Sequence, residues 1–136
     1  MSALQETLEL LEWPRLCEHL SSFASTVQGR RSCRLGALPA ALSDSLILQA
    51  RTLEMATLDG LLDGGLSFQG IGDLDPILLR CSKGGTASGE ELLAVAETLG
   101  AARRLRRQID DPDLRPACTD LLVAMATFPE LEQRLK

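Results

Sequence analysis

A glycine-rich segment at residues 68–89 is the part of this 136-residue sequence that comes nearest to a nucleotide-binding loop. Gly84 and Gly89 have the spacing of the two glycines in a phosphate-binding loop, but Glu90-Glu91 follows where such a loop requires Lys and then Ser or Thr. Two carboxylates would repel a triphosphate. Gly70-Ile71-Gly72 lacks the third glycine of a dinucleotide fingerprint, and no convincing strand precedes it. We therefore predict no nucleotide site in these residues.

The adjacent Cys17, Glu18 and His19 are the residue types that bind metals or act as nucleophiles. On a helix, however, neighbouring side chains point about 100° apart and next-but-one side chains about 200° apart, so these three groups diverge. Zinc needs about four converging ligands, which one histidine and dispersed cysteines do not supply. We predict no metal site, and we interpret the three as a partly buried thiol and surface groups.

The carboxylates show no arrangement for acid and base catalysis. Glu6, Glu9 and Glu12 follow helical spacing on a face expected to be exposed, and Glu90-Glu91 lies where a helix dipole favours negative charge. Asp73 has no identifiable base or nucleophile as a partner, so we expect it to cap the helix that follows. The sequence predicts no catalytic residue and no enzyme activity for these residues alone.

The one dense basic cluster consists of Arg103, Arg104, Arg106 and Arg107, which point away from the apolar stripe of the same predicted helix. One interpretation is a face that contacts the phosphates of DNA or RNA, with a salt-dependent affinity. The favoured alternative is an ordinary solvated helix end, because arginines suit the negative end of a helix dipole and Asp110-Asp111 lies within one turn.

Composition limits the class of protein. The sequence is 45% hydrophobic, with three Phe, one Trp and no Tyr, so its core has to be built mainly from aliphatic residues, which favours packed helices. A net charge of −5 argues against a surface that follows a phosphate backbone over its whole length. Four scattered cysteines without a leader segment predict reduced thiols in a cytoplasmic protein, and no apolar run reaches the ~18 residues of a membrane span.

The elements that position these residues are all predicted to be helices. Ser2 with Gln5, and Ser88 with Glu91, have the spacing of capping boxes, and Ser43 is a predicted N-cap. We expect an all-α fold, an irregular bundle of about six or seven helices in one domain over residues 1–136.

Two of the predicted helices are expected at the centre of this bundle. The helix from Ser43 to Leu62 is apolar on more than one side, so we expect other elements to enclose it. The helix from Ser88 to Ile109 has the most regular apolar spacing in the sequence. A helix opened by Pro129 has hardly begun at Lys136, so we expect the chain to be part of a longer protein.

Several short motifs in this order resemble the amino-terminal region of the second-type bacterial MutS family. They are an aromatic-x-Gly-Ile-x-Asp-Leu element at residues 68–74, then Arg80 and a glycine, then the Ser-x-x-Glu-Leu of residues 88–92. Weaker agreements are spaced along the rest of the sequence: Thr7-Leu8-Glu9, Gly29-Arg30, Leu38-Pro39 and Thr52-Leu53-Glu54-Met55-Ala56. The doubled Gly84-Gly85 and the glycines at 60–65 depart from the family pattern.

The resemblance implies a non-catalytic helical core module of a homodimeric ATPase, which would position lever and clamp arms relative to the ATPase. ATP, Mg²⁺ and a carboxy-terminal nuclease domain are implied for the rest of that polypeptide and none of them for these residues. The implied target is branched DNA, in the control of recombination, or the ribosome, in ribosome rescue. A different class of function also remains open, namely a self-contained helical adaptor that binds a protein partner through an apolar groove.

Overall fold

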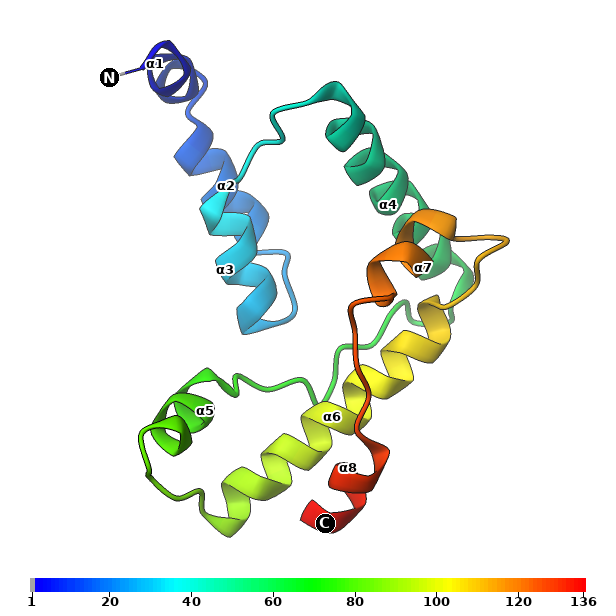
Figure 1. Cartoon of the computed structure of the whole chain (residues 1–136). Helices are drawn as coiled ribbons and strands as arrows, with labels where there is room; N and C mark the ends of the chain where they lie inside the picture. The colour runs from blue at the N-terminus through cyan, green and yellow to red at the C-terminus, as the bar shows by residue number, and fades with distance from the viewer. Residues whose placement is uncertain (1) are drawn as a thin grey trace. The chain divides into compact units, whose positions relative to one another are not determined.

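The computed structural model describes residues 2–136, and these residues form helices and no strand. The prediction of an all-α fold is confirmed, and the described residues form eight helices, slightly more than the six or seven predicted. The helices are α1 (Ala3–Leu10), α2 (Trp13–Ser21), α3 (Val27–Leu35), α4 (Leu42–Leu61), α5 (Asp75–Ser82), α6 (Gly89–Ile109), α7 (Pro116–Leu122) and α8 (Pro129–Leu135). Figure 1 labels them along the chain.

The chain divides into two compact units, one ending at Leu38 and the other beginning at Pro39. The first contains α1 to α3, and the second contains α4 to α8. Because each unit has its own contacts, we describe each separately. That residues 1–136 form one domain stays a prediction.

The first unit is held together where α2 and α3 pack against each other. The Trp13 indole nitrogen donates a hydrogen bond to the Gly36 carbonyl at 3.0 Å, and Cys17 is buried. Gly36 ends α3 in the left-handed region, with φ of 54°, and a Cβ there would lie 2.4 Å from the Cys17 sulfur, so this position requires glycine. Arg34 adds a two-pronged ion pair to Glu18 across the two helices.

The second unit is organised around α6. Small and aliphatic residues of α6 are buried, namely Ala96, Gly100, Ala101 and Leu105. Because three of them are Gly or Ala, α8 can pack closely against α6, beside which Figure 1 shows it lying. At Gly100, a Cβ would lie 2.9 Å from a carboxylate oxygen of Glu132 in α8. The short helix α7 contacts both α4 and α6. The predicted central position of the Ser88 to Ile109 helix is therefore correct within this unit.

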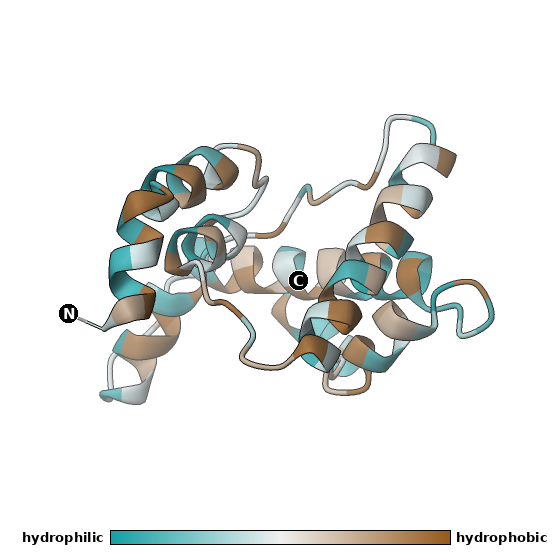
Figure 2. Ribbon diagram, turned by 90° about the horizontal axis from the view of Figure 1, so that it is seen from above, coloured by the Kyte–Doolittle hydropathy of each residue, from teal (hydrophilic) through white to brown (hydrophobic). Residues whose placement is uncertain are grey.

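The prediction that the Ser43 to Leu62 helix is enclosed is wrong. In α4 only Leu58 is buried, whereas Leu46, Leu53 and Leu61 are more than half exposed. Within the described residues α4 packs mainly against α7, which is too short to cover more than one stretch of it. Figure 2 shows hydrophobic and hydrophilic positions alternating along the helices.

One helix start also differs from the sequence prediction. The N-cap of α4 is Ala41, not Ser43, because the backbone turns at Ala41 and its carbonyl accepts the Ser45 amide at 3.2 Å. Ser43 therefore lies inside the first turn. The helix α7 begins at Pro116, because this proline keeps Arg115 before it out of helical geometry (φ −137°, ψ 59°).

The two predicted capping boxes are confirmed. In both, the serine side chain accepts the amide of the residue three positions later, and that residue's side chain accepts the serine amide. Asp73 is not the N-cap of α5, which is Leu74 and has no side-chain cap, but the Asp73 carboxylate accepts the amide of Asp75, the first residue of the helix, at 3.3 Å.

Candidate functional site

The glycine-rich segment at residues 68–74 lies across the middle of α6. The Thr98 hydroxyl accepts the Gly72 amide at 3.0 Å and donates to the Gly70 carbonyl at 3.2 Å. Gly70 has φ of 90°, and a Cβ there would lie 3.4 Å from the Ala101 methyl. The glycines therefore allow the backbone of this segment to approach α6 closely, and the Thr98 side chain fixes the segment there.

The next motif residues fasten α5 to the start of α6. Glu91, which closes the capping box with Ser88, also forms an ion pair with Arg80. Arg80 donates a further hydrogen bond to the Thr86 carbonyl at 3.2 Å. The hydrogen bond from Arg80 lowers the pKa of the Glu91 carboxyl, and the Ser88 amide adds to this. Gly85 is required here because a Cβ would lie 2.9 Å from the Arg80 carbonyl oxygen.

The four predicted nucleic-acid arginines lie in the C-terminal half of α6 but do not share one surface. Arg103 forms a two-pronged ion pair with Glu132 of α8, with nitrogen to oxygen distances of 3.1 and 3.2 Å. Glu132 is only 5% exposed and also accepts Lys136 at 3.0 Å. The hydrogen bond from Arg103, and after it the one from Lys136, lowers the pKa of the Glu132 carboxyl to about 2. Arg103 therefore holds α8 in place.

The Arg106 side chain also forms hydrogen bonds within the fold. Its guanidinium donates to the Leu122 carbonyl at 2.9 Å and to the Met125 carbonyl. Leu122 is the last residue of α7, and Met125 lies in the turn that follows it, so Arg106 binds the C-terminal end of α7 and the turn beyond. The ion pairs expected from Arg106 and Arg107 to Asp110-Asp111 are absent among the described contacts, and Asp111 pairs with Arg115 at 3.6 Å.

Arg104 and Arg107 are the exposed members of the cluster. Arg104 makes one long hydrogen bond, 3.4 Å, to the Gln69 carbonyl. Arg107 has no hydrogen bond or ion pair within residues 2–136. The two lie three positions apart and so share one face of α6. An open cleft of about 500 Å³ beside this face is lined by Gln69, Gly70, Ala96, Glu97, Gly100, Arg104 and Lys136.

A second polar junction, which the sequence analysis did not predict, joins α4, α6 and α7. The Glu54 carboxylate of α4 accepts the amides of Ala117 and Cys118 at 3.1 and 2.7 Å. Although burial opposes the shift, these amide hydrogen bonds lower the pKa of the Glu54 carboxyl. Arg115, just before α7, donates to the Ile109 and Gln108 carbonyls at 2.8 and 3.1 Å. Arg115 thus caps the end of α6, and Glu54 of α4 caps the start of α7.

The one available sequence signal for this junction was weak. Glu54 belongs to one of the motifs of the MutS resemblance, yet nothing in its spacing identifies a partner more than sixty residues away in the sequence. Arg115 and Glu132 lie in no motif. Their roles depend on which helix ends come together in space.

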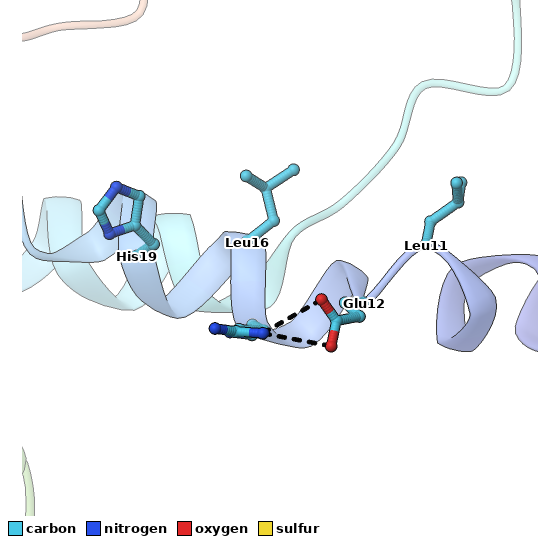
Figure 3. Close-up of a pocket in the computed structure, with 5 residues that line it drawn as sticks. Leu11, Glu12, Leu16 and His19 are labelled. Atoms are coloured by element: carbon cyan, nitrogen blue, oxygen red, sulfur yellow. Dashed lines mark hydrogen bonds and ion pairs between the residues drawn. The ribbon is translucent and has the colours of Figure 1, made fainter.

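The first unit carries an open groove of about 420 Å³ lined by Leu11, Glu12, Arg15, Leu16 and His19. Figure 3 shows Leu11, Leu16 and His19 pointing to the same side, while the Glu12 carboxylate lies lower. Glu12 pairs with Arg15 at 3.2 Å. Leu11 and Leu16 are 65% and 53% exposed, so the groove presents apolar surface beside one ion pair.

The side chains of Cys17, Glu18 and His19 diverge as predicted. Cys17 is buried, Glu18 pairs with Arg34, and His19 packs edge-on against Phe23 at 5.1 Å between ring centroids. Within residues 2–136 no three Cys, His, Asp or Glu side chains gather as metal ligands would. None of the helices in the described residues combines the length and the apolar character that crossing a bilayer demands.

Comparison with known proteins finds close similarity to one group of bacterial proteins. A Synechocystis protein named endonuclease MutS2 is 39% identical over 135 residues, which are 99% of this chain and 16% of that protein. Proteins of the same name from Symbiobacterium thermophilum and Pelotomaculum thermopropionicum are 31% and 28% identical over 97% of the chain. The chain spans about one sixth of the length of these relatives. No family model and no solved structure matches it.

Proposed function

The chain belongs to the family of proteins named endonuclease MutS2, and we propose on this basis that it is a non-catalytic helical module that positions other parts of a longer protein. In this role α6 is the rigid element, and its ends transmit the position of one part of the protein to another. Rigid elements with defined contacts at both ends are what couple distant sites.

The observation that carries the proposal is the way α6 is fastened. Its N-terminal end is held by Arg80, its middle by the 68–74 segment, and its C-terminal half by Glu132 and Arg115. A helix of 21 residues spans about 30 Å at the usual rise per residue. A displacement at one end would therefore be carried to the other end with little bending.

The activities of the longer protein are part of this proposal. The relatives are named endonucleases, and we infer that nuclease chemistry, and the ATP and Mg²⁺ implied by the MutS resemblance, are located outside these residues. We propose a cytoplasmic homodimer that acts on branched DNA or on ribosomes, with this segment linking the ATPase to the arms that enclose the target.

A kink in α6 tests the mechanical role. Ala102→Pro places proline in the interior of α6, where it breaks the helix, and Gly89→Pro places it at the first helical position, where proline is tolerated. In the longer protein, we expect Ala102→Pro to retain ATP hydrolysis but to lose the effect of nucleotide on target binding. Gly89→Pro should leave both unchanged. If nucleotide still controls binding equally in both variants, α6 is not the coupling element.

Nucleic-acid contact is proposed only for the exposed pair Arg104 and Arg107. Arg103 and Arg106 already bond inside the fold, so their guanidinium groups have fewer donors left for phosphate. Branched DNA should bind the 136-residue chain weakly. Because contacts to phosphates depend on salt, the affinity should fall steeply when the salt concentration is raised from about 50 to about 200 mM. Arg104→Gln with Arg107→Gln should weaken this binding further. Unchanged affinity would remove this face as a contact.

The adaptor function is the second candidate, and the groove on the first unit favours it. Leu11 and Leu16 present apolar surface of the kind that receives a partner helix. The reading frame of the gene discriminates the two functions. A frame that continues into an ATPase excludes a self-contained adaptor, and a stop codon after Lys136 excludes the coupling module.

A further inference from the structure

The short helix α7 has no side-chain cap of its own at its start. It has seven residues, and the residue at its N-cap, Arg115, makes no side-chain hydrogen bond to its first turn. A helix this short is marginal in water, because its few hydrogen bonds do not offset the free-energy cost of nucleation. The first amides of α7 need partners from elsewhere, whereas at its end the Asp120 and Leu122 carbonyls accept the Val123 and Met125 amides at 3.2 and 2.9 Å.

Both ends of α7 are capped by charged side chains of other helices. At the start, the Glu54 carboxylate of α4 accepts the Ala117 and Cys118 amides, and Arg51 donates to the Ala117 carbonyl at 3.3 Å. Arg51 and Glu54 lie three positions apart, on one face of α4. At the end, Arg106 of α6 donates to the carbonyls of Leu122 and Met125.

The buried residues of α7 agree with this dependence on neighbours. Cys118 and Leu122, at the two ends of the helix, are its buried residues, at 3% and 6% exposure. The Cys118 thiol also lies 3.5 Å from the Arg51 carbonyl of α4. Figure 1 shows α7 lying beside α4 and close to the end of α6. Removing either neighbour would uncover one end of α7 and one of its buried side chains.

We propose that α7 is a conditional helix, folded only while α4 and α6 keep their present relation. If α4 moves away from α6, α7 loses one cap, unfolds locally and exposes Cys118, while α5, α6 and α8 stay folded. α8 is held separately, by the Arg103 to Glu132 pair. This inference goes beyond the proposed mechanical role. In that role α6 transmits a displacement, whereas here the local unfolding of α7 is a consequence of the displacement of α4 relative to α6.

Hydrogen exchange of the 136-residue chain tests the proposal, with each helix followed by mass spectrometry. The variants Glu54→Gln and Arg106→Gln each remove one charged cap from α7. Glu97→Gln is the matched control, since Glu97 is exposed on α6 and has no hydrogen bond or ion pair in the described structure. In both cap variants we expect exchange of the 114–125 amides to rise about tenfold, the effect of losing a strong cap, with α5 and α8 unchanged.

Alkylation of the cysteines gives a second measurement on the same samples. Burial and then the hydrogen bond with Glu54 raise the pKa of the Cys118 thiol, so its alkylation in the wild type should be slow. Arg106→Gln leaves Glu54 in place, so faster alkylation of Cys118 in that variant reports exposure and not a change in Glu54. The exposed Cys81 should react equally in all variants.

Two results would overturn the proposal. If the 114–125 amides keep their protection in both cap variants, α7 is stable without these caps. If all helices of the second unit lose protection together, α7 does not open separately from its neighbours. Either result concerns the 136-residue chain alone, so it is distinct from a failure of the coupling role, which is measured in the longer protein.

Discussion

The two halves of α6 are fastened by different kinds of contact. In the N-terminal half, the capping box joins residues three positions apart, and Arg80 reaches Glu91 from eleven positions away. In the C-terminal half, Arg103 pairs with a carboxylate 29 positions away and Arg106 with carbonyls 16 and 19 positions away. The first half is organised locally and the second by tertiary contacts.

This difference shows why a basic cluster is a poor guide to a basic surface. Four arginines within five residues look alike in the sequence, yet two hold other helices in place and two are exposed. At the N-terminal half, the serine and the glutamate have roles that follow from their spacing alone. Substitutions in the two halves should therefore differ in size and in which helices they affect.

The largest effect is expected from Arg103→Ala in the C-terminal half. It would leave the buried Glu132 carboxylate with Lys136 as its one remaining cation, and a buried charge that loses its partner is strongly destabilising. We expect the melting temperature of the 136-residue chain to fall by about 5 °C or more, measured by circular dichroism. Arg103→Lys keeps the charge but loses the two-pronged geometry, so its melting temperature should lie between the two. A wild-type melting temperature in Arg103→Ala would mean that α8 does not depend on this pair.

The pH dependence of the same contact is the next effect in size. The Glu132 pKa is about 2 in the fold, below its ordinary value of 4.5 in an unfolded chain. Its contribution to the free energy of unfolding is therefore complete above pH 4.5 and is lost as the pH falls toward 2. The melting temperatures of wild type and Glu132→Gln should differ at pH 7 and converge over this acidic range. A difference that stays constant down to pH 2.5 would contradict the ion pair.

A smaller effect is expected from a methyl group in the N-terminal half. Gly85→Ala would place a Cβ 2.9 Å from the Arg80 carbonyl oxygen, and backbone there has to shift. We expect the free energy of unfolding to fall by about 1–3 kcal/mol in urea denaturation. Gly89→Ala is the control, because its Cβ meets nothing within 4 Å and a gain of roughly 0.4–1 kcal/mol is expected. Equal effects at the two glycines would show that the Gly85 approach is not tight.

The smallest effect is expected from Ser88→Ala, which removes the serine half of the capping box. The loss should be about 1 kcal/mol in urea denaturation, since Glu91 keeps its ion pair with Arg80. Ser43→Ala is the matched control, because Ser43 lies inside the first turn of α4 and not at its cap. Its free energy of unfolding should be almost unchanged. A larger loss at Ser43 than at Ser88 would reverse the assignment of the caps.

Much of the local structure could be predicted. The capping boxes at Ser2 and Ser88 and the proline at the start of α8 follow from short-range rules. The start of α4 was predicted incorrectly, because the backbone turns at Ala41 without any side-chain cap. The exposure of α4 was also predicted incorrectly. Apolar residues on two sides of a helix indicate which faces could be buried, but they do not indicate whether another element packs against those faces.

The helical class, the helix starts at Ser2, Ser88 and Pro129 and the similarity to the MutS2 proteins can be read from the amino-acid order, because they depend on residues a few positions apart or on the order of short motifs. The packing of the helices, in contrast, is needed to show that Glu54 caps α7, that Arg103 and Glu132 hold α8, and that Arg104 and Arg107 are left exposed. The physical reason is that a charged side chain takes whichever donors or acceptors the packing brings within about 3 Å, and sequence separation places no limit on where they come from.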